Sequence, residues 1–355
     1  MGLKSFLIGI TIGIFFFYSY LPQNKIYLQD LGLGEDTKKI FGKVNNYKIH
    51  CSDLTDFDLC FKTYQTNGKN QPVILWLGNS QLHGINNYKL GEQPASADLY
   101  SFFQKKEEYF LTLSQPNANL QEHYLFFTYL LNKFHIKKLI LPLVFDDMRE
   151  DNIRHELLEL LNDEHTILIL NETNIGKNLL KSFNNKKQLI NVNFQENFEN
   201  RLNKKLEFIL PAWKKREEMR GKFLFSLFIL RNSIFKIDGS STRKKIIGPY
   251  EKNKNAYQAM LNLAKINKIS VLVYIAPIRY DVKIPYDISE YSSFKSEMKL
   301  IADNHNAKFI NLENLISGEL WNDIESAEPD FMHFKSAGHR KLAQKLYKEI
   351  ISIKN

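Results

Sequence analysis

Apolar residues fall into short continuous runs, separated by longer stretches in which apolar positions recur with helical spacing. The continuous runs cover 73–77, 110–113, 138–145, 270–276 and 308–311. Runs of this kind are typical of strands that are buried on both faces of a parallel sheet. Amphipathic helices are predicted over 120–134, 255–267, 291–305 and 336–353. The alternation of the two element types predicts an α/β fold, with a parallel sheet flanked by helices.

Two segments fall outside this alternation. Residues 23–70 form a mixed lead-in, in which 47–50 is a short candidate strand, and residues 71–355 form the main domain. An insertion over 151–254 interrupts that domain; 166–170 is predicted to be an extra strand, and most of the remainder is helical. Insertions after a strand's carboxyl end tend to lie over the active-site rim, so both a lid or polymer-binding cap and a helical buttress at the side remain open.

The N-terminus carries an uncharged apolar run from Phe6 to Leu21, preceded by Lys4 and ended by Pro22. At about 1.5 Å per residue, this run needs its flanks to cross a hydrocarbon core of ~30 Å. We expect residues 1–22 to form an uncleaved signal anchor, a single transmembrane helix with a cytoplasmic N-terminus. The main domain would then be extracytoplasmic, in the periplasm or at the cell surface. A cleaved signal peptide is the alternative.

Composition and charge narrow the function classes. The 355 residues are 44% hydrophobic, which is enough for a large core, and the formal net charge is +9. The basic residues are spread out and form no nucleic-acid-binding motif, so we expect no nucleic-acid partner. Such a charge favours an anionic membrane face or an acidic envelope polymer. The sequence has no phosphate-binding loop, dinucleotide motif or zinc-ligand spacing, and we predict neither cofactor nor metal.

The two cysteines, Cys51 and Cys60, are close together in the sequence. In an oxidising compartment they are candidates for a disulfide, worth roughly 2 to 3 kcal/mol. In the cytoplasm they would be free thiols.

Candidate chemistry comes from two distant parts of the chain. Gly78-Asn79-Ser80 ends the first strong strand, and Asp330 and His333 stand three residues apart before the final helix. Serine needs a base to accept its proton, and a neutral imidazole suits that task. We therefore predict Ser80 as the nucleophile, His333 as the base, and Asp330 as the residue that orients the imidazole. The alternatives are a helix cap at Ser80 and ordinary turn or surface roles for the other two.

These motifs resemble the SGNH/GDSL hydrolase superfamily, in which Gly-Asp-Ser follows the first strand and Asp-x-x-His precedes the last helix. The spelling of 78–82 and 330–339 looks closest to membrane-anchored envelope members, namely the D-alanyl-lipoteichoic acid biosynthesis and alginate O-acetylation proteins. The resemblance implies a three-layer α/β/α fold and ester chemistry.

The chain departs from the family pattern around the oxyanion hole. Asn79 replaces the usual Asp, and the family's Gly and Gly-x-Asn-Asp blocks are absent after the second and third strands. A tetrahedral intermediate needs preorganised hydrogen-bond donors. The backbone amide of Ser80 would remain as one such donor. The further candidates for oxyanion or substrate contacts are Asn79, Asn117, Asn119, Arg149 and Arg279. An arginine here would clamp an anionic group, or form an ordinary surface ion pair.

The expected function is that of a membrane-anchored extracytoplasmic serine acyltransferase or esterase acting on O-acyl groups of a cell-surface polysaccharide. A membrane-bound acyltransferase is a candidate partner. One alternative is a non-catalytic scaffold of the same fold that binds polymer or such a partner. The other is a lipase or phospholipase at the membrane surface.

Overall fold

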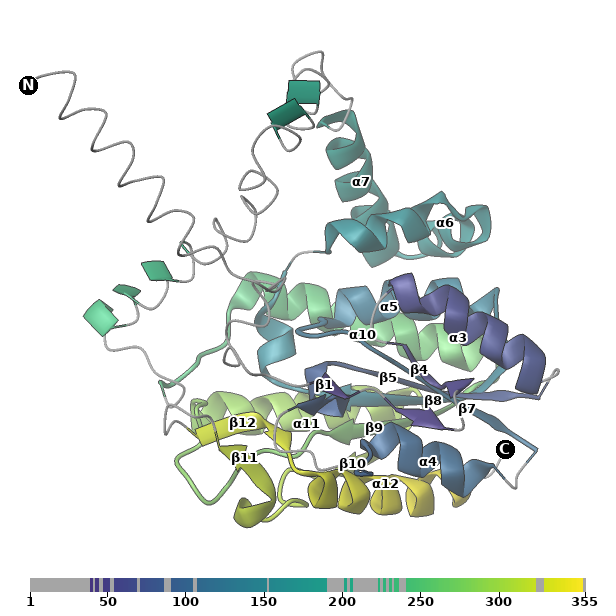
Figure 1. Ribbon diagram of the computed structural model, residues 1–355. Coiled ribbons are helices and arrows are strands. Elements are labelled where there is room, and N and C mark those ends of the chain that lie inside the picture. The colour runs from purple at the N-terminus through teal and green to yellow at the C-terminus, as the bar shows by residue number, and fades with distance from the viewer. Residues whose placement is uncertain are drawn as a thin grey trace, which may run out of the picture. The chain divides into compact units, whose positions relative to one another are not determined.

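Six parallel strands form the central sheet, in the order β10-β9-β8-β5-β7-β4 (Figure 1). The strands are β4 (His50–Cys51), β5 (Val73–Gly78), β7 (Tyr109–Ser114), β8 (Ile136–Leu143), β9 (Ser270–Ile275) and β10 (Lys308–Asn311). Every residue of β5 and β7 is buried, as expected of strands covered on both faces. The prediction of a parallel sheet is therefore confirmed.

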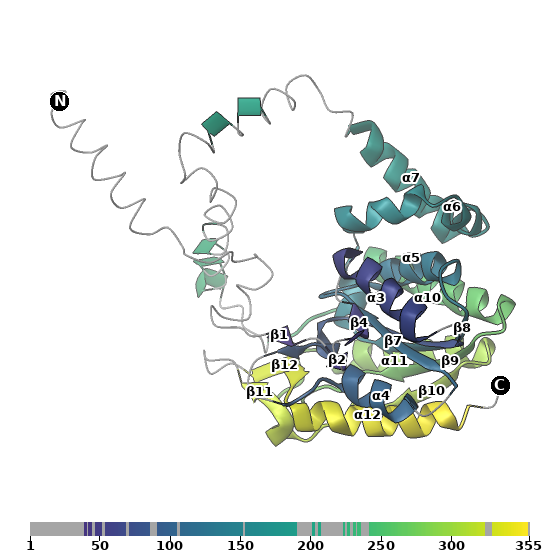
Figure 2. The same cartoon turned by 45° about the vertical axis from the view of Figure 1, so that its right-hand side comes forward.

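Helices cover both faces of the sheet, which gives three layers (Figure 2). On one face lie α3 (Leu54–Asn67), α5 (Leu120–Leu131) and α10 (Ile247–Ile266). On the other face α4 (Ala95–Phe103) packs beside α12 (Ser336–Ile351). Helix α11 (Ile288–Asn304) contacts α10: the hydroxyl of Tyr250 in α10 donates a hydrogen bond to Oε2 of Glu297 in α11 at 2.6 Å. The α/β fold with flanking helices is thus as predicted from the sequence.

Short elements complete the edges of the sheet. Strand β1 (Lys39–Ile40) pairs antiparallel with β6 (Gly84–Ile85), β2 (Lys43–Val44) with β3 (Tyr47–Lys48), and β11 (Trp321–Asp323) with β12 (Pro329–Phe334). Single-turn helices follow β5, β8 and β10: η1 (Ser80–Leu82), η2 (Asp146–Arg149) and η5 (Gly318–Leu320). The residues that follow β5 and β8 meet at one edge of the sheet, as the carboxyl ends of parallel strands must.

The extra strand predicted at 166–170 is wrong. The structure has helix α6 (Glu164–Asn171) there, between η3 (His155–Asn162) and α7 (Asn174–Leu189). Asp163 caps this helix by accepting hydrogen bonds from the Thr166 amide at 2.9 Å and from its hydroxyl at 2.8 Å. Thr166 and Leu170 are buried four residues apart while Leu168 is exposed, so the apolar run fits one helical face rather than a strand. Helix α10 also begins at Ile247, inside the predicted insertion.

The disulfide candidate lies at the edge of the sheet. Cys51 at the end of β4 is joined to Cys60 of α3 in a disulfide bond, and both residues are fully buried. The bond joins β4 to α3 within the lead-in segment, and β4 pairs with β7, so this segment forms part of the central sheet.

The computed structural model describes residues 39–40, 42–44, 47–51, 54–68, 71–85, 91–104, 107–151, 153–189, 241–323 and 329–353, and short pieces of 201–235. These residues belong almost entirely to one of two units, 38–184 with 239–355; the other comprises 1–37 and 185–238. The predicted anchor at 1–22 lies outside the described residues, as does most of the helical pattern at 199–235. Among the helices that are described, none has the length and apolar character needed to span a bilayer.

Candidate active site

The sharp turn after β5 positions the candidate nucleophile. Strand β5 ends at Gly78, and Ser80 is the first residue of η1. Asn79 caps this short helix, since its Oδ1 accepts the Gln81 amide at 3.0 Å. A Cβ on Gly78 would lie 2.2 Å from a methyl carbon of Leu82, so a larger residue here would displace the buried Leu82 side chain that closes the turn. The turn therefore holds Ser80 at the carboxyl edge of the sheet.

The candidate acid and base lie on β12, which crosses this edge. Oδ1 of Asp330 accepts the backbone amides of Met332 at 2.8 Å and His333 at 3.0 Å, which folds the carboxylate back toward the imidazole. Its other oxygen, Oδ2, lies 2.9 Å from His333 Nδ1. The second ring nitrogen of His333, Nε2, lies 3.1 Å from Ser80 Oγ. Two segments that are far apart in sequence thus form one continuous hydrogen-bonded chain.

Burial and charge set the protonation states in this chain. Ser80, Asp330 and His333 are 8%, 5% and 6% exposed. Burial opposes ionisation of Asp330, but the His333 charge and the hydrogen bonds it accepts outweigh this, so the pKa of the carboxyl lies below its ordinary value. An ionised Asp330 favours the tautomer with its proton on Nδ1. The lone pair of Nε2 then faces the serine hydroxyl, the arrangement that a general base requires.

Asn79, predicted as an oxyanion or substrate contact, has a structural role instead. Its Nδ2 donates to Asp147 Oδ2 at 2.8 Å, which links η1 to η2 across the edge of the sheet. Burial raises the pKa of Asp147 well above its usual range; the Asn79 hydrogen bond opposes the shift, and the neighbouring Asp146 carboxylate adds to it. With its oxygen on Gln81 and its amide on Asp147, Asn79 holds the nucleophile turn in place.

The two other asparagine candidates lie after β7. Asn117 is exposed, in a turn with a φ of 53°, a conformation that asparagine adopts more readily than most residues. Asn119 caps α5: its Oδ1 accepts the Glu122 amide at 3.0 Å, and Glu122 accepts the Asn119 amide in return. The capping box accounts for Asn119 without a role in catalysis.

Arg149 and Arg279, the two arginine candidates, form ion pairs with neighbouring aspartates, which was the alternative to a role in binding an anionic substrate. Arg149 donates to Asp146 Oδ1 at 3.2 Å and to the Lys244 carbonyl at 2.9 Å. Arg279 is 3.1 Å from Asp281 and also donates to a backbone carbonyl. The loop that carries Arg279 does lie at the predicted edge, because Gln81 Nε2 donates to the Pro277 carbonyl at 2.9 Å.

Several histidines besides His333 are buried around the site. His83, three residues after Ser80, makes a 2.7 Å hydrogen bond between its Nε2 and Ser114 Oγ at the end of β7. The same hydroxyl bonds His50 Nε2, and His50 Nδ1 lies 2.8 Å from Ser96 Oγ. Since Ser114 has a single proton, one of these imidazoles must donate to it. This network fastens η1 to β4, β7 and α4.

Three histidines, which we call the buried histidines, have the pKa of their imidazole lowered to about 3: His50, His123 and His339. In each, the main cause is burial, and nearby positive charges add to it. They are therefore neutral at physiological pH.

Gln115 is a residue of interest that the sequence reasoning missed. It follows Ser114 directly, and its backbone amide donates to the Gly78 carbonyl at 3.0 Å, next to the nucleophile turn. Its side chain is buried, and Oε1 finds no hydrogen-bond partner within the described part of the chain. The signal was present, since Gln115 follows a predicted strand at the same edge as Ser80. Asp147, which follows the next predicted strand, was detectable in the same way.

Comparison with known proteins gives a likeness of fold. No family model and no curated protein matches the chain. A GDSL-like lipase from Bacteroides thetaiotaomicron is 10% identical with a TM-score of 0.37, over 82% of this chain and 97% of its own. An acetylxylan esterase from Geobacillus stearothermophilus is 9% identical with a TM-score of 0.38, over 80% and 95%. An aryl esterase of M. smegmatis is 10% identical with a TM-score of 0.36, over 80% and 100%. The function proposed below rests on the geometry of the site.

Proposed function

We propose that this protein is a serine-dependent ester hydrolase or acyltransferase. The carrying observation is the chain of two contacts, 3.1 Å from Ser80 Oγ to His333 Nε2 and 2.9 Å from His333 Nδ1 to Asp330 Oδ2. These lengths lie within the range needed for proton transfer between a nucleophile and its base. A structural helix cap at Ser80 would need no imidazole, and the cap of η1 is Asn79.

The reaction follows from the direction of these hydrogen bonds. Ser80 Oγ attacks an acyl carbonyl as His333 Nε2 takes its proton, and Asp330 stabilises the imidazolium. His333 then returns the proton to the leaving oxygen as the ester bond breaks, which leaves the acyl group on Ser80. Water or a sugar hydroxyl, deprotonated by His333, attacks the acyl-enzyme and releases an acid or a new ester.

The oxyanion that forms in each addition needs at least one fixed donor. The Ser80 amide stands at the first position of η1, ahead of the hydrogen bonds that a helix makes within itself. The side-chain NH2 group of Gln115 is our candidate for a second donor, because the backbone amide of this residue donates to the Gly78 carbonyl next to the nucleophile turn. Its side chain is buried, and the carbonyl oxygen Oε1 has no hydrogen-bond partner among the described residues.

The substrate and location are finer parts of the same proposal. We propose that the enzyme is anchored by residues 1–22, faces an extracytoplasmic compartment, and acts on O-acyl groups of a cell-surface polysaccharide, together with a membrane-bound acyltransferase. The apolar run 6–21 supports the anchor. The disulfide between Cys51 and Cys60 supports an oxidising compartment.

A fluorophosphonate probe tests the proposal, because it reacts covalently only with an activated serine. We expect labelling of the wild type and of Ser293→Ala, an exposed serine on α11 that serves as the control, and no labelling of Ser80→Ala. Absence of labelling at every pH from 5 to 9 would favour a non-catalytic scaffold. Release of acetate from acetylated polysaccharide supports the proposed substrate, whereas release of fatty acid from phospholipid vesicles alone would point to a lipase.

A further inference from the structure

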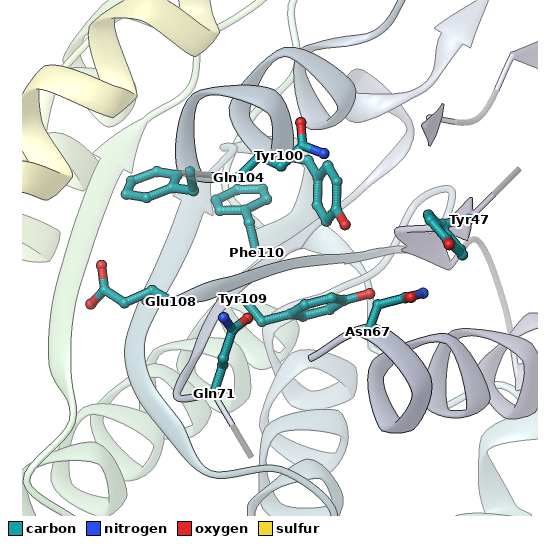
Figure 3. Close-up of a pocket in the computed structure, with 9 residues that line it drawn as sticks. Tyr47, Asn67, Gln71, Tyr100, Gln104, Glu108, Tyr109 and Phe110 are labelled. Atoms are coloured by element: carbon teal, nitrogen blue, oxygen red, sulfur yellow. The ribbon is translucent and has the colours of Figure 1, made fainter. Parts of the chain in front are cut away.

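A cavity lies at the opposite edge of the sheet from Ser80 (Figure 3). It has a volume of about 230 Å³ and aromatic and polar walls, formed by Tyr47, Asn67, Gln71, Tyr100, Phe103, Gln104, Glu108, Tyr109 and Phe110. Tyr109 begins β7 and Gln71 precedes β5, so the cavity lies at the amino ends of these strands. Ser80 follows the carboxyl end of β5, whose six residues span about 20 Å. The two sites are therefore separate.

Two polar groups of this cavity have no hydrogen-bond partner in the part of the chain that the structure describes. Tyr109 is only 3% exposed, and its hydroxyl makes no hydrogen bond to any described residue. The same holds for Nδ2 of Asn67, the last residue of α3, and Figure 3 shows the Tyr109 ring extending toward it. Buried polar groups are almost always hydrogen-bonded. Two such donors at one cavity indicate that an oxygen atom from outside the chain occupies it.

The other walls define what kind of molecule brings that oxygen. Among the described residues that line the cavity none is a lysine or arginine, and the one carboxylate, Glu108, is paired with Lys138 at 2.9 Å. An anion would find no counter-charge among these residues, and a cation would have to compete with Lys138. Tyr47, which is 40% exposed, presents an aromatic ring, and Gln71 and Gln104 add side-chain amides. Aromatic walls with a few placed polar groups suit a neutral ring that has apolar faces and hydroxyl edges.

We propose that this cavity binds a single ring of a neutral sugar. Hydroxyl oxygens of the sugar accept from Tyr109 and Asn67, while its C–H face packs on an aromatic ring. The volume corresponds to roughly eight water molecules. It is also below the ~300 Å³ at which pockets for larger ligands begin, so one ring enters and the rest of a polymer stays outside. This site is independent of ester chemistry at Ser80; if the substrate is a polysaccharide, it holds that polymer at a distance from the reacting bond.

Sugar titrations of the full chain, purified without a sugar-based detergent, test the proposal. The probes are the methyl glycosides of glucose, galactose, xylose and N-acetylglucosamine, with glucuronate as the anionic counterpart, followed by ligand-observed NMR. We expect saturable binding of at least one neutral glycoside and weaker or no binding of glucuronate. No saturable binding of any glycoside, or tighter binding of glucuronate, would overturn the proposal.

Three variants locate the site. Tyr109→Phe keeps the ring and removes the hydroxyl, and should weaken binding about 3- to 10-fold, the effect of one hydrogen bond. Tyr47→Ala should weaken it by about 10-fold or more through loss of the aromatic surface. Tyr280→Ala is the matched control, because Tyr280 is 45% exposed and follows β9, and should leave binding unchanged. Binding that survives Tyr47→Ala and fails in Tyr280→Ala would place the sugar elsewhere.

Ester hydrolysis distinguishes this proposal from the proposed function. Hydrolysis of p-nitrophenyl acetate should stay at the wild-type rate in Tyr47→Ala and Tyr109→Phe, because neither residue belongs to the candidate active site. Loss of sugar binding would leave that activity intact, and an inactive Ser80 would leave sugar binding intact.

Discussion

Replacing Asp330 by Asn changes the protonation of the proposed base while it preserves the local fold. In the wild type, Oδ1 of Asp330 accepts the amides of Met332 and His333, and Oδ2 accepts the Nδ1 proton of His333. In Asp330→Asn, the amide oxygen can keep both backbone hydrogen bonds. Its NH2 group then faces His333 Nδ1, which must become the acceptor. The ring proton moves to Nε2, the atom that lies 3.1 Å from Ser80 Oγ, and the base can no longer accept the serine proton.

The size of the effect follows from this tautomer change. The equivalent substitution in serine proteases lowers kcat by about 10⁴, or ~5.5 kcal/mol of activation free energy. The free energy of unfolding should change little, because the turn keeps its two backbone hydrogen bonds. Asp330→Ala provides the contrast: it removes the acceptor for both buried amides and should also lower the unfolding free energy by about 1 to 3 kcal/mol.

The assay is p-nitrophenyl acetate hydrolysis together with urea unfolding of the same preparations. We expect Asp330→Asn to be about 10⁴-fold slower yet as stable as the wild type, and Asp330→Ala to be slower and less stable. An Asn variant that keeps a tenth or more of wild-type kcat would refute the reasoning. In that case Asp330 would only shape the turn, and His333 would be held in its tautomer by another group.

Three further predictions concern the surroundings of the site. Gln115→Ala should lower kcat by about 100-fold with little change in KM if Gln115 is an oxyanion donor, and unchanged kinetics would exclude that role. The buried histidines stay uncharged when folded, so stability is fully present above pH 6.5 and is lost as pH falls toward 3. At pH 5 each of these histidines should lower the free energy of unfolding by about 2 kcal/mol relative to its value above pH 6.5. Equal unfolding free energies in urea at pH 5 and pH 7 would contradict this prediction. The pKa of Asp147 is raised, so the free energy of unfolding should fall as the pH rises above the ordinary pKa of an aspartate. In the same urea experiment, the unfolding free energy of Asp147→Asn should therefore rise relative to that of the wild type from pH 5 to pH 8. A difference between the two proteins that does not change with pH would show that Asp147 is not protonated.

Much of the fold follows from local pattern. The run at 308–311 coincides with β10, and the other continuous apolar runs differ from their strands by one or two residues at an end. A strand that is covered on both faces must be apolar throughout, which makes it visible in the sequence. The run at 166–170 had the same appearance but forms α6, because the Asp163 cap and a single buried face decided the outcome. Short apolar runs do not distinguish a strand from a partly buried helix.

The site was predictable to the extent that it follows strand ends. Ser80, Gln115 and Asp147 each follow the end of a parallel strand within one to four residues, and strand order alone places them near one another. What sequence could not give was the partner of each polar side chain. Asn79 was a candidate for contact with substrate, yet the oxygen and the nitrogen of its side-chain amide are both hydrogen-bonded within the protein. Arg279 was a candidate anion clamp and is paired with Asp281.

The position of His333 depends on structure far from the nucleophile. Strand β12 is not part of the central sheet; it pairs with β11, contacts η1, and leads directly into α12, which packs against α4 on one face of the domain. Helix α4 in turn precedes β7, whose terminal Ser114 is hydrogen-bonded to His83 just beyond η1. The nucleophile turn and the base are therefore held by the same layer of helices. Because the hydroxyl and imidazole must stay within about 0.5 Å of their productive distance, packing of α12 on α4 is as much a requirement for the proposed chemistry as the identity of the three residues.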